Sequence, residues 1–128
     1  MERKIAHVAL VVRDYDEAIE FYTRAMGFVL TEDTVLDDEK RWVTVSPSEQ
    51  SGCSLLLAKA KNDHQMSRIG NQTGGRVFLF LHTDDFWRDF NRLKENQVKV
   101  VRQPSTEAWG TVAVFEDLYG NLWDLIEK

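Results

Sequence analysis

The amino-acid sequence predicts an α+β domain of two tandem modules, each with the element order βαβββ, whose concave sheets enclose a cavity. Three observations support this prediction. Residues 5–58 contain a strand pattern, an amphipathic helix and three further strand patterns, and residues 76–127 repeat that order after the polar connection 59–75. A shift of 71 residues places Asp14 on Asp85, together with the apolar positions of the helices that follow them. Such internal similarity favours a duplicated fold.

In the first module, the nearly continuous apolar run of residues 5–12 predicts a strand that is covered on both faces. Asp14 supplies an N-cap oxygen for a helix that ends where Gly27 can adopt a left-handed conformation. The apolar residues between them recur at helical spacing, which predicts an amphipathic helix of about three turns. Three further strands are predicted at residues 28–36, 41–47 and 54–58.

The second module begins with a predicted strand at residues 76–82 and a helix that is capped by Asp84-Asp85 and ends at Asn96. A strand is expected at 98–103, and residues 104–108 are expected to form a loop. The chain then closes with a hairpin, in which Gly120 allows a positive φ in the turn. The strands of this hairpin are predicted at residues 111–116 and 122–127.

The length, charge and cysteine content of the chain indicate which partners and which cellular compartment to expect. The length of 128 residues suits one domain, and the net charge of -5 gives no basic surface for nucleic acid. The apolar run at residues 5–12 is too short to cross a membrane and lacks a small-residue cleavage site. The single cysteine, Cys53, excludes an internal disulfide and fits a reducing compartment. We therefore expect a cytoplasmic protein with neither a nucleic-acid nor a membrane partner.

Two motifs at opposite ends of the chain carry a family resemblance. Residues 7–14 lead into Ala18, Phe21-Tyr22 and Met26-Gly27-Phe28, and residues 115–125 read Phe-Glu-Asp-Leu-Tyr-Gly-Asn-Leu-Trp-Asp-Leu. In both motifs the sequence resembles the vicinal oxygen chelate superfamily, which includes glyoxalase I, bleomycin and fosfomycin resistance proteins, extradiol dioxygenases and methylmalonyl-CoA epimerase. The resemblance implies the glyoxalase/bleomycin resistance-like fold, a cavity for a small molecule and a homodimer.

The resemblance also implies a divalent metal, such as Zn, Ni, Mn or Fe, held by the first and last strand of each module. The first ligand position falls on His7, and the last falls on Asp124, where the family usually has Glu. The other two positions fall on Leu55-Leu56-Leu57 and on Phe78, none of which can bind a metal. His82 offers an imidazole about 13 Å further along the strand from Phe78. The metal site is therefore predicted to be incomplete, since catalytic sites ordinarily keep three protein ligands.

His7 and Asp124 have two other interpretations. They can form a hydrogen-bonded pair that satisfies buried polar groups, or an acid–base pair in which the carboxylate orients the imidazole. Five further residues are candidates for binding the substrate, because strand alternation or an aromatic wall would place them at the cavity: Arg76, Phe78, His82, Trp42 and Trp109. Each of these residues also has a purely structural interpretation. Arg76 could be a solvated residue at the start of a strand, His82 could simply lead from the strand end into the following helix cap, and tryptophans are often core residues.

Two functions remain open from the sequence. In the first, the protein binds a small polar or aromatic ligand without a complete metal site. In the second, it is a glyoxalase-like lyase, isomerase or dioxygenase that uses a divalent metal or the His7/Asp124 acid–base pair. The missing ligands favour the first function. No nucleophile elbow, phosphate-binding loop or dinucleotide fingerprint points to another chemistry.

Overall fold

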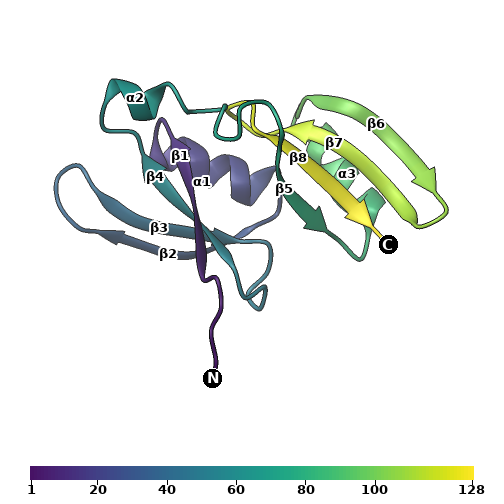
Figure 1. The fold of residues 1–128 in the computed structure, drawn as a ribbon, viewed down its shortest axis with the longest axis horizontal. Coiled ribbons are helices and arrows are strands. Elements are labelled where there is room, and N and C mark those ends of the chain that lie inside the picture. Colours follow the sequence, from purple (N-terminus) through teal and green to yellow (C-terminus); the bar gives the residue numbers. More distant parts are fainter. The chain divides into compact units, whose positions relative to one another are not determined.

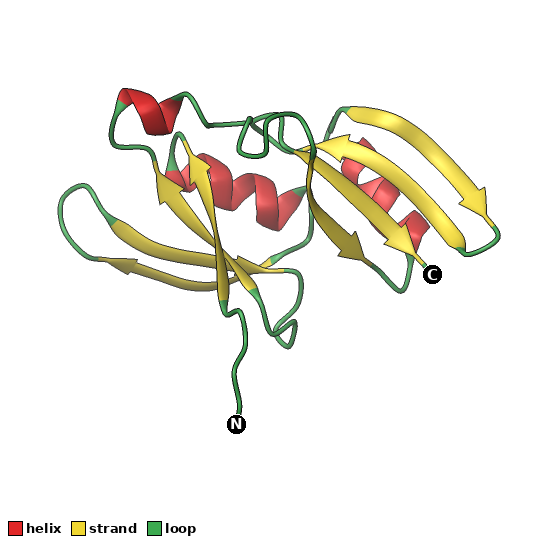
Figure 2. Cartoon of the chain, in the orientation of Figure 1, coloured by secondary structure: helices red, strands yellow, loops and turns green.

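The computed structural model describes all of residues 1–128 and contains eight strands and three helices (Figure 1; Figure 2). The chain divides into two compact units, Met1–Arg68 and Ile69–Lys128. The first contains β1 (His7–Val12), α1 (Tyr15–Arg24), β2 (Val29–Val35), β3 (Arg41–Ser46), β4 (Ser54–Lys59) and α2 (Asp63–Met66). The second contains β5 (Val77–His82), α3 (Phe86–Glu95), β6 (Val100–Glu107), β7 (Gly110–Glu116) and β8 (Leu122–Glu127). The predicted α+β architecture of two βαβββ modules is confirmed.

The sheet of the first unit has the strand order β1-β4-β3-β2, in which β1 runs parallel to β4 and the other neighbours are antiparallel. Helix α1 packs on one face of this sheet, over alternate apolar residues: Leu10, Val12, Val43, Val45, Leu55 and Leu57. Because strand side chains alternate between faces, the intervening residues line the other side. We call this side the first open face; it carries His7, Ala9, Val11, Trp42, Thr44, Ser46, Ser54, Leu56 and Ala58.

Helix α1 begins and ends where the sequence predicts. The Asp14 side chain accepts a hydrogen bond from the Glu17 backbone N–H at 2.9 Å, which satisfies one of the unpaired donors of the first turn. Gly27 has a φ of 69°, and the next residue, Phe28, donates its N–H to the Tyr22 carbonyl at 2.9 Å. Tyr22 is fully buried between the helix and the sheet.

The sheet of the second unit has the order β5-β8-β7-β6, and β5 runs parallel to β8. Phe86, Phe90 and Leu93 of α3 are buried with the side chains of β7 and β8 that alternate toward the helix: Ala113, Phe115, Trp123 and Leu125. The face turned away from α3 carries the alternate residues, Phe80, His82, Arg102, Val112, Val114, Asp124 and Ile126, which are paired across the strands. We call it the second open face.

Two elements differ from the prediction. Residues 104–108 were expected to form a loop, but β6 continues through Pro104 to Glu107. The strand accommodates proline because β6 is an edge strand and its register with β7 shifts between Arg102 and Ser105. The connection 59–75 contains the short helix α2, which Asn62 caps by accepting a hydrogen bond from the Gln65 N–H at 2.9 Å. None of the three helices is long and apolar enough to cross a lipid bilayer.

Candidate functional site

The first open face holds the contact between His7 and Trp42. His7 begins β1 and pairs with Ser54 of β4, while Trp42 lies on β3, on the far side of β4. Their rings nevertheless meet nearly at right angles, with centroids 5.7 Å apart. An edge-to-face arrangement is favourable between aromatic rings and restrains the imidazole of His7. The structure therefore brings together two of the residues that the sequence singles out.

Hydroxyl groups surround this contact on the same sheet. Ser46 donates a hydrogen bond to Ser54 through their side-chain oxygens at 3.0 Å, and the hydroxyls of Thr31 and Thr44 lie 2.6 Å apart. Thr44 and Ser46 are almost fully buried, so these bonds offset the cost of removing their hydroxyls from water. The sequence analysis did not single them out, because a strand threonine or serine carries no signal of its burial.

On the second open face, Asp124 lies in a row of four side chains. It pairs with Phe80 of β5 on one side and with Val114 of β7 on the other, and Val114 pairs with Arg102 of β6. Paired residues of neighbouring strands place their side chains on the same face. The Phe80 side chain is 60% exposed, whereas the neighbours of Asp124 in β8, Trp123 and Leu125, are buried on the α3 side. The row thus combines an exposed aromatic ring, a carboxyl group and a guanidinium group.

Burial raises the pKa of the Asp124 carboxyl above its usual value, and the positive charge of Arg102 partly opposes this shift. Removing a carboxylate from water disfavours its charged form, whereas a nearby cation favours that form. Asp124 therefore holds its proton more readily than a solvated aspartate does.

Replacing Asp124 with asparagine is expected to stabilise the protein at neutral pH and to have little effect below the ordinary aspartate pKa of 3.8. Because the folded state binds the proton more tightly than the unfolded state, stability is lost as the pH rises from 3.8 through the raised pKa of the folded state. Urea unfolding of both proteins at acidic and neutral pH measures the difference. A variant that is less stable than the parent at neutral pH would contradict this account.

The remaining predicted site residues lie at the borders of β5 and β6. Arg76 precedes β5 and is exposed, His82 ends β5 and is exposed, and Trp109 is 52% exposed in the turn between β6 and β7. Phe78 is half-buried, with its ring edge-on to Trp123 at a centroid distance of 6.2 Å. The β5–β8 register shifts between Val77 and Leu79, so simple alternation does not carry through this point. A shared orientation of Arg76, Phe78 and His82 stays a prediction.

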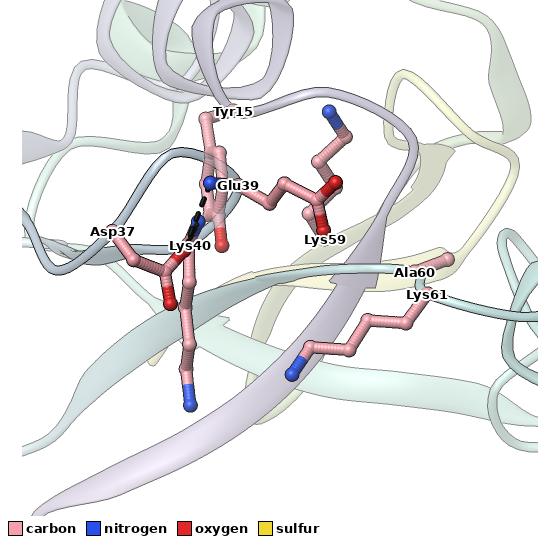
Figure 3. A pocket seen from close by; sticks show the side chains of 7 residues that line it. All are labelled: Tyr15, Asp37, Glu39, Lys40, Lys59, Ala60 and Lys61. Carbon is pink, nitrogen blue, oxygen red and sulfur yellow. Dashed lines mark hydrogen bonds between the residues drawn. The ribbon is translucent and has the colours of Figure 1, made fainter.

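A separate cavity of about 360 Å³ lies in the first unit (Figure 3). It is lined by the start of α1, the turn between β2 and β3, and the end of β4: Tyr15, Asp37, Glu39, Lys40, Lys59, Ala60 and Lys61. The sequence gives no sign of this cavity, because residues 37–40 lie between two predicted strands and residues 59–61 begin the polar connection. No local motif joins these segments; the pairing of β3 with β4 brings them together.

Comparison with known proteins decides the family. The Glyoxalase/Bleomycin resistance protein/Dioxygenase superfamily model matches residues 4–125. The chain belongs to this superfamily. An uncharacterized protein of Shewanella frigidimarina is 59% identical over 128 residues, which cover 99% of this chain and 95% of that protein.

Two solved structures show the same fold. UcmS2 is 29% identical, with a TM-score of 0.83 and coverage of 98% of each chain. TnmS3, described as an antibiotic binding protein from Streptomyces sp. CB03234, is also 29% identical, with a TM-score of 0.77 and coverage of 98% of this chain and 96% of that one. The comparisons agree with the fold and with the family resemblance of the two terminal motifs.

The residues at the superfamily's metal positions do not make up its usual donor set. Strand pairing identifies Leu56 as the counterpart of Asp124, because the next residues, Leu57 and Leu125, are both buried and pair with Leu10 and Leu81. The four positions that the family resemblance implies are thus His7 and Leu56 in the first unit and Phe78 and Asp124 in the second. Two are hydrocarbon side chains without a donor atom. Neither unit by itself contains a cluster of three or more His, Cys, Asp or Glu that could hold a metal ion.

Proposed function

We propose that this chain is a small-molecule-binding protein whose ligand contacts an open sheet face through an aromatic or apolar part and a polar group, without metal-dependent chemistry. The proposal rests chiefly on Leu56 and Phe78, which occupy two of the four positions where the family resemblance implies metal ligands. Both side chains are half-buried and have no atom that can bind an ion, so they offer hydrocarbon at these positions. Ligand pockets are typically lined by such side chains, with a few polar groups that fix the ligand's orientation.

The Phe80 row supplies both kinds of contact. A flat ligand that covers the exposed Phe80 ring removes apolar surface from water and gains about 25 cal/mol for each Å² buried. Asp124 and Arg102, in the same row, offer an acceptor or donor and a fixed positive charge. On the first open face, the His7–Trp42 pair offers a second aromatic surface with a ring nitrogen. That TnmS3 is described as an antibiotic binding protein agrees with a binding role for this chain.

Binding can be tested by titrating the protein with a panel of aromatic antibiotics that includes bleomycin, with dicarbonyls and glutathione adducts as further classes. We expect an aromatic compound to raise the melting temperature, and Phe80→Ala to weaken its binding about tenfold, or about 1.4 kcal/mol. Trp87→Ala is the matched control, because Trp87 is similarly exposed, at 53%, but lies on helix α3. Equal losses in the two variants, or no shift with any compound, would argue against the proposal.

Elemental analysis of the untagged protein tests the metal-free part of the proposal. After incubation with Zn, Ni, Mn or Fe and extensive dialysis, we expect less than stoichiometric metal, because two donors are too few for a stable catalytic site. A stoichiometric metal that is lost in His7→Ala would overturn this part and favour the alternative of a glyoxalase-like lyase, isomerase or dioxygenase.

We also propose that the protein acts as a homodimer in the cytoplasm. The superfamily resemblance is the support for the dimer, since its members commonly complete their cavities across two chains. Light scattering after size-exclusion chromatography measures the mass directly. A monomer at all accessible concentrations would contradict the proposed dimer.

A further inference from the structure

The cavity of Figure 3 is distinct from the open face of its own unit. Lys59 pairs with Val12, a buried residue of the α1 side, and continues the alternation of Leu55 and Leu57. Tyr15, which also lines the cavity, is the first residue of α1 itself. His7 and Trp42 lie on the opposite face of the sheet. A ligand in this cavity would therefore not compete for the contacts proposed above.

Positive charge exceeds negative charge around the cavity, although the chain as a whole carries a net charge of -5. Lys40, Lys59 and Lys61 face Asp37 and Glu39, and none of these three lysines takes part in an ion pair of the structure. The Asp37 carboxylate is already engaged, because its Oδ1 accepts hydrogen bonds from the N–H groups of Glu39 and Lys40, both at 2.8 Å. Ammonium groups thus remain available to an incoming anion.

The pKa of the Asp37 carboxyl responds to the positive charges around the cavity. Its pKa is lowered chiefly by the backbone hydrogen bonds from Glu39 and Lys40, and the charges of Lys61 and Lys40 lower it further. The lysines therefore act on a negative group that lines the cavity. An anionic ligand would experience the same attraction, which salt would weaken.

Tyr15 adds a buried donor to the cavity wall. It is only 6% exposed, and its hydroxyl oxygen accepts a hydrogen bond from the Arg41 N–H at 3.2 Å, which leaves the hydroxyl proton free to be donated. Its ring is held in place by Arg41, whose guanidinium carbon lies 5.1 Å from the ring centroid. Arg41 is itself fixed by ion pairs to Asp33 at 2.7 Å and to Asp16 at 2.9 Å. These contacts of Arg41 hold the Tyr15 ring in its orientation at the cavity wall.

We propose that this cavity binds a small phosphorylated molecule through Lys40, Lys61 and the Tyr15 hydroxyl. In Figure 3 the ammonium groups of Lys40 and Lys61 extend to the bottom of the view, with Asp37 beside the Lys40 side chain, whereas Glu39 lies with Lys59 at the upper right. A phosphoryl group suits the first side, because an ammonium is a compact charge with three rotatable donors, while planar carboxylates are matched best by the arginine fork. A cavity of about 360 Å³ is large enough for a small organic phosphate.

Calorimetric titration of the full chain with inorganic pyrophosphate, at constant ionic strength, tests the proposal. Lys40→Gln and Lys61→Gln are each expected to raise the Kd about tenfold, or about 1.4 kcal/mol. Glu39→Gln is expected to lower the Kd, because it removes a repulsive charge from the cavity wall. Lys4→Gln is the matched control. Lys4 is an exposed lysine that precedes the start of β1, whereas the cavity lies at the other end of this strand, where Val12 pairs with Lys59.

Three results would overturn the proposal. Absence of pyrophosphate binding at millimolar concentration would show that the cavity is no anion site. Equal weakening by Lys4→Gln would show only diffuse attraction to positive charge. Citrate binding as tight as pyrophosphate binding would contradict the preference for phosphoryl groups. All of the substituted side chains are exposed, and circular dichroism checks that each variant keeps its fold.

Discussion

Replacing Asp117 with alanine is expected to lower the free energy of unfolding by about 3–5 kcal/mol, because a buried turn loses its central acceptor. The Asp117 Oδ1 accepts hydrogen bonds from the backbone N–H groups of Tyr119, Gly120 and Asn121, at 2.9, 3.1 and 2.9 Å. Its Oδ2 accepts another from the Asn121 side-chain amide at 2.9 Å. Asp117 and Asn121 are only 5% and 4% exposed, so water cannot readily replace the lost acceptor.

Two other variants isolate the effect of burial in this prediction. Asp117→Asn keeps an oxygen that can accept the three backbone bonds, so we expect a smaller loss than with alanine. Asp37→Ala removes a carboxylate that also accepts two backbone bonds, but in an exposed turn where water can substitute. We expect it to cost less than about 1 kcal/mol. Urea unfolding followed by circular dichroism gives all three values, and similar losses for Asp117→Ala and Asp37→Ala would refute the role of burial.

The sequence predicts the two-module fold well because local signals and core periodicity agree in both halves. Asp14 and Asp85 cap the helices as expected, with bonds to the backbone N–H groups of Glu17 and Arg88. The apolar residues that recur at helical spacing in α3, Phe86, Phe90 and Leu93, are all buried. Each of these features depends on residues within one or two helical turns of one another, which a single sequence displays directly.

Strand details were less predictable because they depend on pairing partners. Pro104 normally indicates a loop, and the edge position of β6 together with its register shift against β7 explains the place of this proline within a strand. The register shift near Phe78 likewise interrupts the alternation from which its orientation was predicted. Such irregularities arise from the fit between two strands, and neither strand's sequence reports them alone.

Residues of the candidate site that belong to a local motif could be predicted, whereas those placed by strand pairing could not. His7 and Asp124 could be identified because they stand inside the two terminal motifs. Phe80 and Arg102 share the row of Asp124 on the second open face, but the sequence does not assign them to it. Their place depends on the registers of three strand pairs, β5–β8, β8–β7 and β7–β6. The lysine-lined cavity was missed for the same reason, since its walls come from three segments that are distant in the sequence.

Gly70→Ala is expected to destabilise the protein by about 2–5 kcal/mol, since it combines backbone strain with a steric clash. Gly70 has a φ of +76°, a conformation that costs an alanine about 1–2 kcal/mol. A Cβ at this position would also lie 1.9 Å from the Tyr119 carbonyl oxygen, which requires the backbone to move and adds about 1–3 kcal/mol. Tyr119 cannot move freely, because its N–H donates to Asp117 in the buried turn.

Gly74→Ala separates the two contributions to this loss. Gly74 has a similar φ of +70°, but a Cβ there would meet no atom within 4 Å, so only the conformational cost of about 1–2 kcal/mol is expected. The difference between the two variants in urea unfolding therefore measures the contact of Gly70 with the Asp117 turn. If both variants lose the same stability, the close approach of Gly70 to Tyr119 is not a constraint on the folded protein, and the end of the 59–75 connection is free to move away from the turn.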